Sequence, residues 1–159
     1  MTQPQTSLRG GAAVGLLADL PPLEAGTVRY FRYWFSGPSA RADLQQALCD
    51  SLGPDSAQSA YDSFGRLCDF CVTHGRRPLI RHGMTCSCLG ADENCFANLV
   101  AAATQGEAAD ADLLAALLVP PQKAQALSAL AAQTGLLLLH LVGKAPLRRL
   151  YRPGSATLH

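Results

Sequence analysis

The sequence has few charged residues and almost no excess of either sign. Charged residues make up 16% of the 159 positions, and the formal net charge at pH 7 is +1. A chain with so little net charge has no global attraction to nucleic acid or to an anionic membrane, so any electrostatic function must be local. Apolar residues make up 48% of the chain, which argues against a disordered polar chain and predicts one globular domain.

The sequence shows no clear secretory signal and no membrane-spanning run. Asp19 interrupts the weak apolar stretch near the N-terminus. The longest apolar run, residues 136–142, is far shorter than the roughly 20 residues that cross a bilayer, and His140 interrupts it. We therefore expect a protein of a reducing, bacterial-type cytoplasm that does not enter the membrane. There its six cysteines would be buried, metal-bound or redox-active rather than permanently paired.

The sequence contains none of the familiar catalytic motifs and few β-branched residues. No GxSxG, HExxH, Walker A or GxGxxG pattern occurs. Alanine and leucine, both good helix formers, supply much of the apolar content. The composition therefore favours an all-α fold, whereas nothing in it identifies a substrate or a reaction.

Five segments carry the apolar spacing of amphipathic helices. They begin near residues 38, 54, 92, 107 and 122, and Gly53, Gly75, Gly106, Pro120 and Gly135 close them. Residues 28–35 and 136–142 are ambiguous between helix and strand. The spacing of Arg29 and Arg32 favours a helix for residues 28–35, with Thr27 as its N-cap. We expect this segment to pack on the core with its arginines in solvent; the alternative is an aromatic and basic surface that stacks nucleic-acid bases.

These segments together predict a single-domain, antiparallel helical bundle of about five or six helices around a central Cys/His-rich loop. Residues 1–23 are rich in Gly, Pro, Gln and Ala, and we expect them to form a flexible arm. Residues 24–143 would form the helical domain, and residues 144–159 a basic C-terminal tail. A homodimer is expected if the helices expose apolar stripes.

The loop that joins the second and third of these segments holds most of the chemistry. Its spacing is His82-x3-Cys86-x-Cys88-x6-Cys95. Structural zinc sites take four nitrogen and sulfur ligands in a tetrahedron, so this pattern predicts a zinc site. Cys95 is the first choice for the fourth ligand, with Cys71 or Asp92 as alternatives.

Other interpretations of the same loop remain open. An iron–sulfur cluster could use Cys71 and the three loop cysteines, although the spacing differs from known patterns. A redox-sensing thiol pair is a second alternative. In a third, the cysteines stay reduced, His82 bonds to backbone and Asp92 acts only as a helix cap. The Cys68-x-x-Cys71 pair lies on the apolar face of a predicted helix, where we expect it to pack as small hydrophobic side chains.

Arg76, Arg77 and Arg81 form the densest positive patch in the sequence. Such a cluster could hold phosphate or an acidic partner. The alternative is a solvated helix C-terminus, where positive charge complements the helix dipole.

The stretch RRPLIRHGMTCSCLGADENCF resembles a group of small bacterial helical proteins that carry an RRPLxRH...CxCxGxDE-like segment. The likeness covers roughly residues 33–141. No activity is attached to that group, so the resemblance supports the loop as a site and implies nothing about its purpose.

Three hypotheses for function follow from these features. The first is a zinc-binding regulatory or adaptor protein without enzymatic activity. The second is a metal-free module that binds a protein or nucleic acid through Arg76, Arg77 and Arg81. The third is a small metalloenzyme in which Glu93 is the general base beside a metal-bound water.

Overall fold

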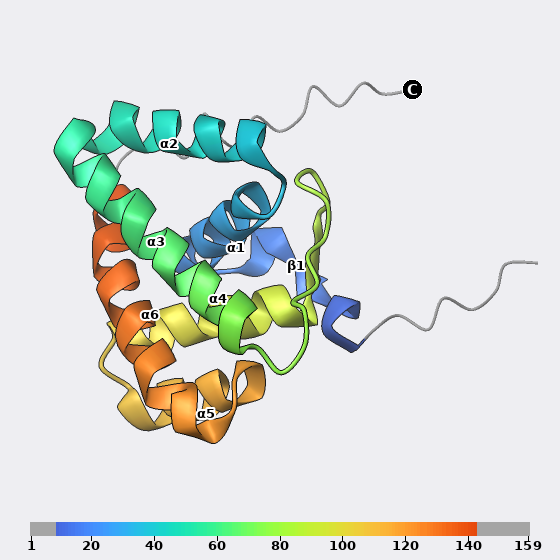
Figure 1. The fold of residues 1–159 in the computed structure, drawn as a ribbon. Helices are drawn as coiled ribbons and strands as arrows, with labels where there is room; N and C mark the ends of the chain where they lie inside the picture. Colours follow the sequence, from blue (N-terminus) through green and yellow to red (C-terminus); the bar gives the residue numbers. More distant parts are fainter. Residues whose placement is uncertain (1–8, 143–159) are drawn as a thin grey trace, which may run out of the picture.

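The structure, a computed structural model, describes residues 9–142 and is an all-α helical bundle with one small sheet (Figure 1). The predicted fold class is thereby confirmed. This part of the chain contains six α-helices: α1 Pro22–Trp34, α2 Pro38–Leu52, α3 Pro54–His74, α4 Ala91–Thr104, α5 Ala108–Leu118 and α6 Pro121–Val142. The predicted basic tail, residues 144–159, lies outside the described residues.

Proline begins four of these six helices. Proline has no backbone N–H and a fixed φ, so it fits the first helical turn, where an N–H has no intrahelical partner. Gly53 alone separates α2 from α3, and its φ of +79° is readily adopted only by glycine. That sharp reversal lets α2 and α3 pack against each other.

The two ambiguous segments are both helical. Residues 28–34 belong to α1, which begins earlier than expected at Pro22. Thr27 is therefore not an N-cap, and its hydroxyl donates to the carbonyl of Leu23 at 2.8 Å. Residues 136–142 continue α6, so the expected stop at Gly135 was wrong. A Cβ atom on Gly135 would collide with Thr104, which indicates that this glycine allows close packing of α6 on α4.

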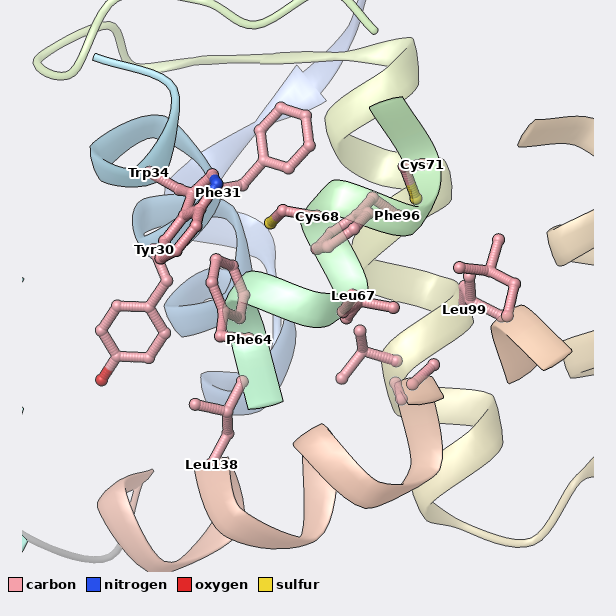
Figure 2. Packing of buried hydrophobic residues seen from close by; sticks show 14 of the residues in the cluster. Tyr30, Phe31, Trp34, Phe64, Leu67, Cys68, Cys71, Phe96, Leu99 and Leu138 are labelled. Carbon is pink, nitrogen blue, oxygen red and sulfur yellow. The ribbon is translucent and has the colours of Figure 1, made fainter. Parts of the chain in front are cut away.

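Helix α4 is the central helix of the bundle and packs against α1, α5 and α6. Its buried apolar residues lie on several faces: Phe96, Ala97, Leu99, Val100, Ala101 and Ala102. The ring of Phe96 lies between those of Phe31 and Phe64, with centroid distances of 4.8 and 6.1 Å. Figure 2 shows this aromatic cluster beside Cys68 and Cys71 of α3. Both thiols are buried, which confirms their predicted packing role.

The N-terminal segment differs from the predicted flexible arm. From Arg9 onward it contains two short 3-10 turns, Arg9–Gly11 and Leu17–Asp19, and the strand β1, Ala13–Leu16. Strand β1 pairs antiparallel with β2, Cys88–Gly90, and Leu16 lies opposite Cys88. The side chains of β1 are exposed, so backbone pairing rather than an apolar pattern determines its position. The loop before α4 is thereby attached to the N-terminal segment.

Helix α6 is long and apolar enough, by length and composition alone, to cross a membrane over Pro121–Leu141. In the bundle it is a core helix, because Leu127, Ala131 and Leu138 are buried against its neighbours. The hydroxyls of Thr134 and Ser63 also form a buried hydrogen bond of 2.9 Å between α6 and α3. The expectation that the chain does not enter a membrane stays a prediction.

Truncation of Leu99 to alanine tests the central position of α4. Leu99 is fully buried, so Leu99→Ala should lower the free energy of unfolding by about 2–5 kcal/mol, through lost burial and a new cavity. Leu113→Ala is the matched control, because Leu113 is 69% exposed on α5 and its loss should cost about 0.5 kcal/mol or less. Urea unfolding measures both. Equal destabilisation by the two substitutions would contradict this arrangement of the core.

Candidate functional site

Residues 75–87 form the long loop that leaves α3 and returns to the bundle as β2 (Figure 1). Within this loop the backbone N–H of Cys86 donates to the carbonyl of Gly83 at 3.0 Å. That turn folds the chain back, so that Cys86 lies over His82. The N–H of Leu17 donates to the carbonyl of Ser87 at 2.9 Å and extends the contact with the N-terminal segment.

A fully buried ion pair joins α1 to α4 beneath this loop. The guanidinium of Arg32 donates through Nε to Glu93 Oε1 at 2.7 Å and through Nη2 to Oε2 at 3.0 Å. Both side chains have no exposed surface. Two-point contacts of this kind fix the relative orientation of the two groups as well as their distance. We had expected Arg32 to point into solvent, and that expectation was wrong.

The remaining hydrogen-bonding capacity of this pair is directed at the loop. Arg32 donates to the carbonyls of Cys86 and Cys88 at 2.6 and 2.8 Å. Glu93 accepts from the backbone N–H groups of His82 and Gly90, each at 2.9 Å. A buried ion pair is tolerated only when its remaining donors and acceptors are satisfied. Here the loop backbone satisfies them, and the loop is held in place as a result.

These contacts determine the charge state of Glu93. Burial alone would raise the pKa of its carboxyl, but hydrogen bonds from Arg32, Gly90 and His82 outweigh burial and lower the pKa below its usual value. Glu93 is therefore ionised at neutral pH. Because it is buried and bound to Arg32, it has no access to solvent as the predicted general base would need.

Asp92 provides a second anchor for the loop. It accepts two hydrogen bonds from Arg77, both 2.8 Å, and one from the N–H of Ile80 at 2.8 Å. A Cβ atom on Gly10 would collide with this carboxylate, so the absence of a side chain at residue 10 lets the N-terminal segment approach it. Asp92 thus acts neither as a simple cap nor as a free donor for a metal ion.

His82 and Cys86 form a thiol–imidazole pair at the surface end of the site. Cys86 Sγ lies 3.6 Å from His82 Nδ1. His82 Nε2 lies 2.9 Å from the carbonyl oxygen of Gly11, which can only accept a hydrogen bond. The proton on Nε2 is therefore fixed by Gly11, and Nδ1 faces the thiol. Both side chains are partly exposed.

The same contacts shift both pKa values toward the charged pair. Hydrogen bonds to the Gly11 carbonyl and to Cys86 raise the pKa of His82 above its usual value. A hydrogen bond from His82 and another from the backbone N–H of Cys88 lower the pKa of Cys86. A thiol with a lowered pKa and a partly exposed sulfur is more reactive than an ordinary cysteine.

Two of the other predicted zinc ligands, Cys95 and Cys71, are not brought to this point. The Cys95 thiol contacts the carbonyl of Leu114 at 3.6 Å, and burial raises its pKa to about 11. Cys71 is buried in the core, which raises its pKa to about 12. Across residues 9–142, no group of three or more His, Cys, Asp or Glu side chains is arranged to hold a metal ion. The geometry gives the four-ligand site no support beyond the pairing of His82 with Cys86, and zinc stays a prediction.

The arginine cluster is engaged in contacts within the protein. Arg77 binds Asp92, Arg76 Nε donates to the carbonyl of Ala116 at 3.0 Å, and Arg81 Nε donates to that of Phe35 at 3.2 Å. All three residues are exposed. They hold the loop against α1, α4 and α5, and a role in binding phosphate or a partner stays a prediction.

Two residues of the site were not identified as such from the sequence. The sequence did not indicate that Arg32 is buried. Arg29 and Arg32 are three residues apart in a predicted helix, and arginines at that spacing usually lie on a face exposed to solvent. Gly11 contributes only a backbone carbonyl, which no side-chain pattern can reveal. Its position depends on the pairing of β1 with β2.

Replacement of Arg32 tests the buried pair. Arg32→Met should lower the free energy of unfolding by about 3–5 kcal/mol, because it leaves the Glu93 carboxylate buried without its partner. The double variant Arg32→Met/Glu93→Met should lose less than the sum of the two single losses. Arg66→Met, at an exposed position of α3, is the control and should change stability by about 0.5 kcal/mol or less. Chemical unfolding of the unaltered chain, of Arg32→Met, of Glu93→Met and of the double variant gives the coupling energy, and strict additivity would contradict a direct interaction.

The lowered pKa of Glu93 predicts the direction of a pH effect. Because its folded-state pKa lies below the ordinary value of 4.5, its contribution to stability is complete above pH 4.5 and is lost as the pH falls through the folded-state value. The amide signals of His82 and Gly90, which donate to this carboxylate, should titrate together in NMR spectra with a midpoint below 4.5. A midpoint above 4.5 would show that burial, not hydrogen bonding, dominates.

Comparisons of the chain with protein-family models, with curated proteins and with solved structures found no match. The resemblance to small bacterial helical proteins therefore stays a prediction. The function must therefore be inferred from the residues of the protein itself. The most informative contact is that of the Cys86 thiol with His82 Nδ1 at 3.6 Å, in which the other ring nitrogen of His82 faces the carbonyl oxygen of Gly11.

Proposed function

We propose that this protein is a regulatory or adaptor protein whose responsive group is the Cys86 thiol, activated by His82. The observation that carries the proposal is the contact between Cys86 Sγ and His82 Nδ1 at 3.6 Å, with Nε2 held by the Gly11 carbonyl. A nucleophile, a base and a group that orients the base are the three parts of an activated thiol. Of the alternatives for the loop, this arrangement favours the redox-sensing thiol.

The position of Cys86 supports a role in signalling rather than in the core. Cys86 lies in a loop whose ends are fixed by Arg32, Glu93 and Asp92, so its sulfur is presented in one geometry. A chemical change at this sulfur would reach α1 and α4 through the Arg32 hydrogen bonds. The nearby apolar side chains of Leu16 and Met84 are 49% and 39% exposed, which favours contact with a macromolecular partner.

Helix α5 offers a second surface for such a partner. Leu113 and Leu117, one helical turn apart, are 69% and 67% exposed. Exposed leucines at this spacing are typical of helices that pack on another protein. They favour the adaptor part of the proposal and keep a homodimer among its predictions. A nucleic-acid partner finds less support, because the arginine cluster is tied to backbone carbonyls and to Asp92.

Alkylation kinetics test the activation of Cys86. The thiolate is the reacting form, so the rate of Cys86 modification by iodoacetamide should rise with a midpoint below the ordinary thiol pKa of 9.0. His82→Gln should move that midpoint upward and slow the reaction at neutral pH, because the hydrogen bond from His82 that lowers the pKa of Cys86 is lost. Mass spectrometry of the modified peptides identifies the cysteine.

His74→Gln is the control for this measurement, because His74 stacks on Phe70 with a centroid distance of 4.5 Å and should leave the rate unchanged. Equal rates of Cys86 alkylation in the unaltered chain and in His82→Gln would overturn the proposal. Elemental analysis of untagged protein gives the competing outcome. If the protein contains one zinc ion per chain and the double variant Cys86→Ser/Cys88→Ser contains none, the zinc site predicted from the sequence is the correct interpretation and the reactive thiol is not.

A further inference from the structure

We propose that Cys88 is the resolving thiol of this site: a hydroperoxide oxidises Cys86, and Cys88 then closes a disulfide with it inside the loop. This inference rests on the proposed function, because it needs Cys86 to react first. It adds a class of oxidant, a second reacting residue and a defined product. The product would be an intrachain bridge that spans only Ser87.

The two cysteines are separated by Ser87 alone. Because a single residue separates them, their Cα atoms lie at most about 7 Å apart, so a disulfide, which spans about 4.4–6.8 Å between Cα atoms, needs at most a small movement of the backbone. The guanidinium of Arg32 binds the backbone carbonyls of both residues, Cys86 at 2.6 Å and Cys88 at 2.8 Å, so their backbones are held around the same group. Both side chains are partly exposed, which allows a small peroxide to enter.

The remaining cysteines are poorer partners. Cys68 and Cys71 are buried in the core among aromatic rings (Figure 2). Cys95 contacts the carbonyl of Leu114 on α5, and Cys49 lies on α2 against the core. All six cysteines fall within residues 9–142, so each of them can be compared. Cys88 is the partner that the chain holds next to Cys86.

The chemistry balances with a hydroperoxide as the oxidant. The Cys86 sulfur attacks one oxygen, the O–O bond breaks, and the other oxygen leaves as an alcohol or water after it takes the proton that His82 received from the thiol. Cys86 is then a sulfenic acid. The Cys88 sulfur attacks the sulfenic sulfur, the S–O bond breaks, and water leaves with the proton of Cys88. Two thiols have lost two electrons, and the peroxide has gained them.

The Arg32 guanidinium connects this reaction to the fold. It binds the carbonyl oxygens of both reacting residues, Cys86 at 2.6 Å and Cys88 at 2.8 Å. Closing a ring across a single residue reorients at least one of these carbonyls, and it also strains the pairing of Cys88 with Leu16. The oxidised loop should therefore hold α1 and β1 less firmly than the reduced loop does.

Treatment of the full-length protein with hydrogen peroxide tests the inference. Peptide mapping without reductant should find the Cys86–Cys88 disulfide in the unaltered chain. In Cys88→Ser, Cys86 has no resolving partner, so labelling of its sulfenic acid by dimedone should rise by about tenfold or more. Cys95→Ser is the matched control, and the disulfide should form in it as in the unaltered chain.

The outcomes separate this inference from the proposed function. Rapid oxidation of Cys86 with equal dimedone labelling in the unaltered chain and in Cys88→Ser would overturn the role of Cys88 and leave an activated Cys86 in place. A disulfide from Cys86 to Cys95, or to a second chain, would do the same. If Cys86 is oxidised no faster than Cys49, both proposals are overturned. Cys86 would then not be an activated thiol, and Cys88 would have no sulfenic acid to attack.

Discussion

The ion pair between Arg32 and Glu93 determines where the loop between α3 and α4 lies. Two charges without exposed surface are costly to bury, and they are tolerated because each nitrogen of the guanidinium and each oxygen of the carboxylate has a hydrogen-bond partner. The partners that complete the pair are backbone groups of His82, Cys86, Cys88 and Gly90. The cost of burying the charges is thus offset by contacts that also order the end of the loop and the strand β2 that follows it. Residues 61 positions apart in the chain thereby fix the geometry of the thiol.

The N-terminal segment completes the site from the other side. Strand β1 pairs with β2, Gly10 makes room for the carboxylate of Asp92, and Gly11 receives the ring N–H of His82. Because the proton of His82 is fixed at Nε2, the opposite nitrogen is directed at Cys86. A loop attached by α1, α4 and β1 can transmit a change at its sulfur to three elements of the fold.

Much of the helical frame could be predicted from the sequence, because its signals are local. Proline and glycine mark where α2 and α3 begin, and the apolar spacing of Phe96, Leu99 and Val100 identifies α4. The site could be predicted only in part. The spacing placed His82 and Cys86 in one loop, and the two side chains do meet there, but the directions of Cys88, Cys95 and Cys71 depend on contacts between distant segments. The burial of Arg32 and the pairing of β1 leave no periodic pattern in the sequence. For this reason Arg32, which orders the site, was expected to lie in solvent.

Hydrogen–deuterium exchange in the variant Arg32→Lys tests most directly whether the buried pair holds the loop. Lysine keeps the positive charge but cannot bind two carbonyls and a carboxylate through a planar fork. If the pair orders the loop, exchange of the amides in residues 82–90 should rise by about tenfold or more, because local opening becomes easier. The amides of α3, Pro54–His74, should change much less. Unchanged protection of residues 82–90 in this variant would contradict the account.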